Sequence, residues 1–221
     1  MALDLRGEDA KNKAPLLQDR AGLTTIASSL LRANHGSMKS LMVTSCRAKE
    51  GKTVTAMNIG RALVDAAGKR VLYVDGNHES PGLGAYVTIP QSPGFTDFVH
   101  GRASFENIVY DPQNDGLSVI PAGSPGPRNL DHYRMENFKN ILTTLGENFD
   151  LVIFDGPSVF GKQDLGTIAG AFDGVILVIE CEKTPWEVAQ SARKRLEEMG
   201  ANILGATMNK RKYYIPRGLY V

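Results

Sequence analysis

Short runs of apolar and β-branched residues recur along the chain, and stretches with helical periodicity separate several of them. The runs lack alternating polar positions, which is typical of strands covered on both faces. The pattern therefore predicts a single α/β domain with a mostly parallel central sheet flanked by helices on both faces. The expected strands are Ser40–Ser45, Arg70–Asp75, Leu117–Ile120, Leu151–Asp155, Val175–Ile179 and Ile203–Met208, and the expected helices between them are Lys52–Ala67, Asp131–Glu147 and Pro185–Met199.

Local signals mark the ends of these helices. Gly68, Gly146 and Gly200 stand where C-terminal caps are expected. The segment Thr184–Glu187 has the pattern of a capping box with proline at the first helical position. A further amphipathic helix is expected over Leu16–Leu31.

Length and composition indicate one soluble domain. A chain of 221 residues is too short for two comfortable domains, and its net charge of +1 provides no field for nucleic acid or an anionic membrane. No apolar run approaches the roughly 20 residues that span a bilayer, and the polar N-terminus does not resemble a secretory signal. We therefore expect a cytoplasmic protein with a flexible arm at 1–14, a domain at 15–212 and a tail at 213–221.

The strongest chemical signal is a Gly-Lys-Thr sequence, Gly51-Lys52-Thr53, between a predicted strand and a predicted helix. In such a turn the backbone N–H groups and the helix dipole attract phosphate. Lys52 would neutralise the β- and γ-phosphates of ATP, and the Thr53 hydroxyl would ligate Mg²⁺. Cys46 stands where the full pattern has glycine. The nucleotide-binding candidates of the turn are Arg47, Lys49, Glu50, Gly51, Lys52, Thr53 and Val54.

Two carboxylates close predicted strands. Asp75 follows Val71–Val74, and Asp155 follows Leu151–Phe154. Ligands in open α/β sheets bind outside the carboxyl ends of the strands, so both acids should face Lys52. Metal-assisted phosphoryl transfer requires oxygen ligands there. Lys52, Asp75 and Asp155 are thus the catalytic candidates, and Thr53, Asp75 and Asp155 are the metal-binding candidates.

The order of these motifs resembles the deviant-Walker P-loop ATPases, and among them the bacterial tyrosine kinases of capsule and exopolysaccharide assembly. Further matching segments are Leu117–Gly123, Met135–Asp150 and Leu204–Asn209. The resemblance implies a P-loop NTPase domain that binds ATP or ADP with Mg²⁺, and it implies that Asn209 contacts adenine. Arg211, in the basic run Lys210–Lys212, is a further candidate to flank the base or contact an acidic partner, and a solvated charge run is the favoured alternative. It also implies autophosphorylation on tail tyrosines, here Tyr213, Tyr214 and Tyr220.

The family's partner is the cytoplasmic end of a membrane polysaccharide co-polymerase. Because no membrane segment is apparent in this sequence, we expect that partner to be a separate chain, which would bring the protein to the inner face of the membrane. Self-association into a homo-oligomer is a further expectation.

Several positions depart from the kinase pattern. Ala48-Lys49 stands in place of Pro-Gly, and Asn77 and Glu79 stand in place of the second aspartate and the arginine of Asp-x-Asp-x-Arg. Arg47 lies near the signature lysine of the family. We therefore hypothesise an ATP-binding, kinase-like regulator of polysaccharide polymerisation and export with weak or absent kinase activity. The alternatives are an active tyrosine autokinase, a positioning ATPase like those of septum placement or partition, and a scaffold that has lost nucleotide.

Overall fold

The computed structural model describes residue 28 and residues 38–78, 80–112, 115–125, 135–161 and 168–212. Its strands are β1 (Ser40–Ser45), β2 (Val71–Asp75), β3 (Leu117–Ile120), β4 (Leu151–Asp155), β5 (Gly174–Glu180) and β6 (Ile203–Asn209). Its α-helices are α2 (Lys52–Ala67), α3 (Phe95–Val99), α4 (Met135–Gly146) and α5 (Trp186–Glu198), and the short 3-10 helices are η2 (Leu83–Ala85), η3 (Phe105–Asn107) and η6 (Ala169–Ala171).

The strands form one six-stranded sheet in the order β3-β2-β4-β1-β5-β6. Every pairing between neighbouring strands is parallel. The first strand thus lies in the middle of the sheet, between β4 and β5. All strands end on the same edge, so the loops that follow β1, β2 and β4 converge there. The predicted α/β fold is confirmed.

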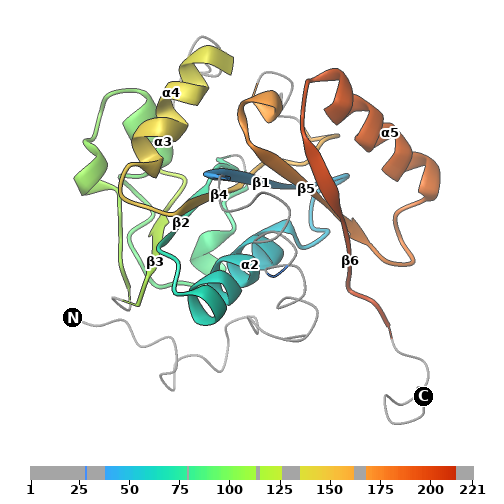
Figure 1. Cartoon of the computed structure of the whole chain (residues 1–221), viewed down its shortest axis with the longest axis horizontal. Helices are drawn as coiled ribbons and strands as arrows, with labels where there is room; N and C mark the ends of the chain where they lie inside the picture. The colour runs from blue at the N-terminus through green and yellow to red at the C-terminus, as the bar shows by residue number, and fades with distance from the viewer. Residues whose placement is uncertain are drawn as a thin grey trace.

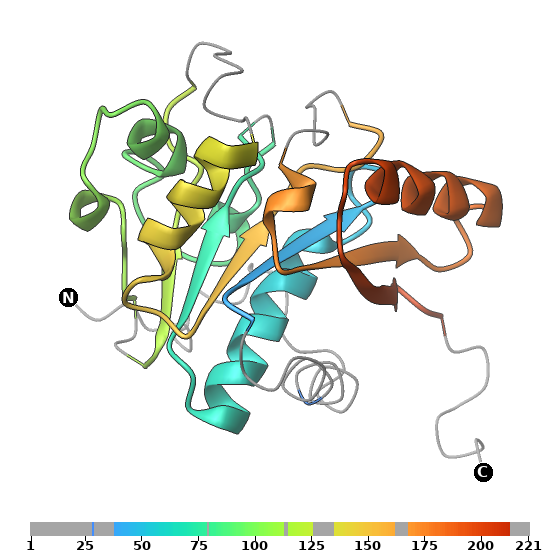
Figure 2. The ribbon, with the colours of Figure 1, turned by 45° about the horizontal axis from the view of Figure 1, so that its top comes forward.

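Helices cover both faces of the sheet. Figures 1 and 2 show α2 on one face and α3, α4 and α5 on the other. The apolar residues of the strands divide in the same way, because successive side chains on a strand point to opposite faces. Leu41 and Val43 of β1 pack in the core beneath α2, whereas Met42 packs in the core shared with α4 and α5.

Four aromatic rings form the centre of the larger core. Phe154, the last apolar residue of β4, lies 5.3 Å from both Phe95 and Phe172, and 5.5 Å from Phe138, between ring centroids. Phe154 meets Phe95 and Phe138 edge to face, the arrangement that aromatic quadrupoles favour. The cluster fixes the residue that directly precedes Asp155.

The predicted elements match the structure closely, with two errors at helix ends. Gly146 is the last residue of α4 itself, so the C-terminal cap expected at this glycine is wrong. Helix α5 begins at Trp186 without a side-chain cap, so the expected capping box at Thr184 is wrong. The Thr184 hydroxyl instead donates to Glu50, 134 residues away in the sequence. Gly68 caps α2 in the left-handed conformation as expected.

Several predictions lie outside the described residues. They are the arm at 1–14, the helix at 16–31 apart from residue 28, Glu79, residues 131–134 of the helix expected at 131–147, and the tail with Tyr213, Tyr214 and Tyr220. Among the residues that are described, no helix is long and apolar enough to cross a membrane.

Candidate functional site

The candidate site lies at the carboxyl edge of the sheet, where β1 turns into α2. Gly51 precedes α2 with a φ of 96°, in the left-handed region that favours glycine. A Cβ atom at this position would lie 1.9 Å from the side-chain nitrogen of Asn209. Only glycine therefore fits at this point of the loop. The 16 residues of α2 then direct their first N–H groups and the helix dipole at the loop.

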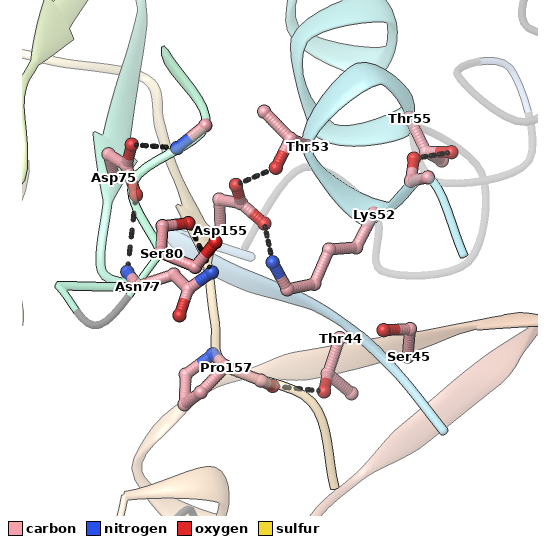
Figure 3. A network of polar contacts seen from close by, with 12 residues as sticks. Thr44, Ser45, Lys52, Thr53, Thr55, Asp75, Asn77, Ser80, Asp155 and Pro157 are labelled. Atoms are coloured by element: carbon pink, nitrogen blue, oxygen red, sulfur yellow. Dashed lines mark hydrogen bonds and ion pairs between the residues drawn. The ribbon is translucent and has the colours of Figure 1, made fainter. Parts of the chain in front are cut away.

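Four of the predicted site residues come together at this edge (Figure 3). Asp75 and Asp155 are direct neighbours in the pairing of β2 with β4. The Thr53 hydroxyl donates to Asp155 Oδ2 over 2.5 Å, and the Lys52 ammonium lies 3.6 Å from Asp155 Oδ1. Lys52 and Thr53 come from the first turn of α2, so the helix start and two strand ends build one charged cluster.

Asp155 is the centre of this cluster. It is fully buried, and its Oδ2 also accepts a hydrogen bond from the Tyr73 hydroxyl. Its Oδ1 is buried without a hydrogen-bond partner, apart from the longer ion pair with Lys52. Burial raises the pKa of this carboxyl, although Lys52, Thr53 and Tyr73 all favour its charged form. A buried oxygen with an unused lone pair is the kind of group that a cation would satisfy.

Asp75 holds the loop that follows β2. Its Oδ1 accepts from the Asn77 N–H, and its Oδ2 accepts from the N–H groups of Gly82 and Leu83. Burial, followed by the charge of Asp155, raises the pKa of Asp75 to about 6. The loop also approaches the helix, because a Cβ atom on Gly82 would lie 2.6 Å from the Thr53 hydroxyl. The Asp75 carboxylate therefore fixes the loop after β2, which lies beside the site.

Asn77, which replaces an aspartate of the kinase pattern, stabilises the same loop. Its side-chain nitrogen donates to the Ser80 carbonyl over 2.7 Å and closes the turn between them. Its neighbour Gly76 lies against the aromatic cluster, since a Cβ atom there would be 2.0 Å from the Phe154 ring. The amide of Asn77 is thus part of the loop structure.

The outer side of the phosphate loop is formed by residues 47–50, of which three are exposed. Arg47, Ala48 and Lys49 are exposed, whereas Glu50 is buried. Glu50 uses both carboxylate oxygens, accepting the Arg47 N–H over 3.0 Å and the Thr184 hydroxyl over 2.5 Å. Its own carbonyl accepts from the side chain of Asn209 over 2.9 Å. Thr184, between β5 and α5, and Asn209, at the end of β6, therefore hold this half of the loop.

Cys46 and the remaining candidates take different places. Cys46 is fully buried, and burial raises the pKa of its thiol to about 11, so it is a packed residue of the loop base. Val54 is partly buried in the first turn of α2, and Arg211 is exposed just beyond β6. The sequence did not point to Tyr73, Thr184 or Lys210, whose polar atoms also contact the site.

The donor set suits a metal that is shared with phosphate. Within the described residues, no group of three or more His, Cys, Asp or Glu side chains could hold a metal ion. Mg²⁺ usually binds proteins through one or two side-chain oxygens, with water and substrate phosphates completing its shell. Thr53 and Asp155 supply such oxygens next to the loop, so the residues fit a magnesium nucleotide.

The chain is similar in sequence to several known proteins. The chain is 30% identical over 174 residues to the tyrosine-protein kinase CpsD of Streptococcus pneumoniae, covering 78% of this chain and 76% of that protein. It is 30% identical over 175 residues to the tyrosine-protein kinase YwqD of Bacillus subtilis, covering 79% and 73%. No protein-family model matches the chain.

Solved structures show the same fold. The kinase domain of VpsO superposes with a TM-score of 0.76 at 28% identity, covering 86% of this chain and 94% of that one. The chimerical protein CapA2B2 gives a TM-score of 0.78 at 24% identity, covering 86% and 84%. The septum site-determining protein MinD of Pyrococcus horikoshii, complexed with Mg-ADP, gives 0.63 at 21% identity, covering 81% and 74%.

Proposed function

The chain belongs to the bacterial tyrosine kinase family of deviant-Walker P-loop ATPases, and on that premise we propose that it is an ATP-binding, kinase-like regulator of exopolysaccharide or capsule polymerisation and export. One observation carries the nucleotide half of this proposal. Lys52 and Thr53, at the start of α2, both contact the buried Asp155, whose Oδ1 has no hydrogen-bond partner. This arrangement supports a phosphate and metal site at the loop.

In the proposed complex each residue has a separate task. The loop N–H groups and the Lys52 ammonium bind the β- and γ-phosphates. Thr53 and Asp155 would hold Mg²⁺, which would supply positive charge to the phosphates, and Asp75 is the second acid beside the site. The side-chain N–H of Asn209 donates a hydrogen bond to the Glu50 carbonyl of the loop. The side-chain oxygen of Asn209 then remains to accept from the exocyclic amino group of adenine.

The kinase activity of this chain is proposed to be weak or absent. Transfer of phosphate to a tyrosine requires a group that accepts the hydroxyl proton. Asn77 occupies a position where the kinases carry an aspartate, and an amide has no basic site at neutral pH. Its side chain is also engaged with Ser80. Asp75 is committed to three backbone N–H groups. The residues around the phosphate site thus favour binding over transfer.

We propose a cytoplasmic location and a membrane partner. The partner is the cytoplasmic end of a separate polysaccharide co-polymerase, and nucleotide binding controls the association. Self-association belongs to the same proposal. These expectations rest on the family resemblance.

Calorimetric titration with ATP tests the nucleotide site directly. The wild-type protein should bind ATP with micromolar affinity in Mg²⁺, and Lys52→Ala should bind at least about 100-fold more weakly, because an ammonium on the phosphates is lost. Lys139→Ala, an exposed lysine on α4, is the matched control and should bind like the wild type. Absence of binding at millimolar ATP would contradict the proposal and favour a scaffold.

Mass spectrometry of protein incubated with Mg-ATP tests the kinase half separately. We expect no phosphate on Tyr213, Tyr214 or Tyr220 above the level found in Lys52→Met. A phosphotyrosine signal that disappears in Lys52→Met would show that the chain is an active autokinase.

A further inference from the structure

The phosphate loop contains a residue in an unfavourable backbone conformation. Lys49 has a φ of 67°, in the left-handed region. This region is disfavoured for any residue with a Cβ atom and is readily adopted by glycine. By the family resemblance, Lys49 stands where the kinases have the glycine of their Pro-Gly pair. The loop therefore has a glycine-type backbone at a residue that is not glycine.

Lys210 contacts the loop at this residue. Its ammonium donates a hydrogen bond to the Lys49 carbonyl over 2.6 Å and forms an ion pair with Glu180 Oε2 over 3.2 Å. Glu180 is the last residue of β5, and its side chain is only 11% exposed. Lys183, on the other carboxylate oxygen, and Lys210 lower the pKa of Glu180, so the carboxylate stays charged and fixes the ammonium.

The contact determines the direction of a backbone donor. In a trans peptide the carbonyl of one residue and the N–H of the next point in opposite directions. Lys210 attracts the Lys49 carbonyl, so the Glu50 N–H is turned away from Lys210. The next carbonyl, that of Glu50, is held by Asn209 in the same manner. Two successive N–H groups of the loop are thus oriented by residues at the end of β6.

We propose that Lys210, fixed by Glu180, is a positioning residue that replaces the missing glycine by holding Lys49 in its left-handed conformation. It keeps the N–H of Glu50 aimed for phosphate, and in this consequence it rests on the proposed nucleotide binding. The contact itself joins two groups of the chain, so it can be measured in the free protein.

Hydrogen–deuterium exchange in segment 47–52 of the ligand-free protein, followed at the Arg47 N–H that donates to Glu50 Oε2, tests the proposal. Lys210→Met should accelerate exchange of this segment about three- to tenfold, because a charge-assisted hydrogen bond is lost at a partly exposed site. The same substitution in a Lys49→Gly background should accelerate it less than about twofold, because glycine adopts the left-handed conformation unaided. Lys183→Met, which removes the other ion pair of Glu180, should leave the segment unchanged.

Two results would overturn the proposal. Unchanged exchange in Lys210→Met would show that the contact does not hold the loop. Equal acceleration by Lys210→Met in the wild-type and Lys49→Gly backgrounds would show an ordinary surface contact without any link to the missing glycine. Thermal melting of each variant checks that the sheet remains folded.

ATP titration of the same variants gives the functional consequence. Lys210→Met should weaken binding about three- to tenfold, and adding Lys49→Gly should bring affinity back to within about twofold of Lys49→Gly alone. Equal affinities in wild type and Lys210→Met would contradict the functional consequence. If the wild type binds no ATP, the proposed function fails, whereas the exchange experiment still decides the role of Lys210.

Discussion

The phosphate site has an inner half, formed by Lys52, Thr53 and Asp155, and an outer half, formed by residues 47–50 of the loop. The two halves are stabilised in different ways. On the inner side Lys52 and Thr53 both contact the fully buried carboxylate of Asp155. On the outer side the exposed residues 47–49 depend on contacts from distant parts of the chain, above all from Thr184 and Lys210. The inner half is specified by its own motif, and the outer half by its surroundings.

This difference indicates which substitutions the loop tolerates. The inner residues match the family pattern, and each contacts another inner residue, so a change at one would leave a buried partner unsatisfied. Residues 48 and 49 depart from the pattern at exposed positions, where other elements supply the lost restraint. The backbone conformation can then be kept while the side chains change.

The largest expected effect is a loss of stability from a substitution at Gly51, which joins the two halves. Gly51→Ala should destabilise the protein by about 2–4 kcal/mol, because the new methyl group meets Asn209 and φ is 96°. Gly68→Ala, at the other end of α2, is the matched control, since φ is 59° and nothing lies within 4 Å. It should cost only about 1 kcal/mol. Equal losses in urea denaturation would show that the Asn209 contact is not restrictive.

A substitution confined to the inner half should act on the metal. Asp155→Asn should weaken binding of Mg-ATP about tenfold and change metal-free ATP binding by less than about threefold, because an amide is a poorer Mg²⁺ ligand than a carboxylate. Calorimetry with Mg²⁺ or with a chelator separates the two. Asp65→Asn, at an exposed position of α2, controls for charge. An unchanged magnesium dependence would place the metal elsewhere.

Asp75, the strand neighbour of Asp155 beside the inner half, should make stability depend on pH. The pKa of Asp75 is raised from its ordinary value of 3.8 to about 6 in the folded protein, so between these values the folded state binds more protons than the unfolded state. Its contribution to the free energy of unfolding therefore decreases as pH rises, by about 1 kcal/mol between pH 5 and pH 7. Urea denaturation of the metal-free protein at several pH values measures this. Asp75→Asn should flatten that part of the profile, and an identical slope would assign it to other groups.

The smallest expected effect is a change in stability from a substitution in the outer half, at Lys49. Lys49→Gly should raise the free energy of unfolding by less than about 1 kcal/mol, because relief of the left-handed conformation is largely offset by the greater freedom of glycine in the unfolded chain. Lys49→Ala removes the same side chain and keeps the strain, so it should give no gain. Equal stability changes in both variants would show that φ at this position carries no cost.

The sequence was sufficient for the strands and for the inner residues. β1, β3 and β4 have the predicted bounds, because each is a short run rich in apolar residues between polar or glycine-containing segments. Parallel strands end on one edge, so Asp75 and Asp155 could be expected beside Lys52 from the order of elements alone.

The outer half could not be predicted in this way. Thr184 fits a helix cap by its local sequence, yet its hydroxyl is used by a buried carboxylate from a distant loop. Lys210 stands within a run of three basic residues that resembles a solvated segment, and its contact with Lys49 depends on the position of β6 beside β5. Local patterns carry no information about such long-range partners, which only the folded sheet brings together.

The contact between Gly76 and the aromatic cluster has a consequence for the evolutionary history of this site. A side chain at position 76 would enter the space of the Phe154 ring, which in turn packs against Phe95, Phe138 and Phe172. We expect related proteins to have a larger residue at position 76 only together with a smaller one at position 154. In a phylogeny we therefore expect these two positions to covary, and Gly76 to persist in each lineage that keeps the phenylalanine.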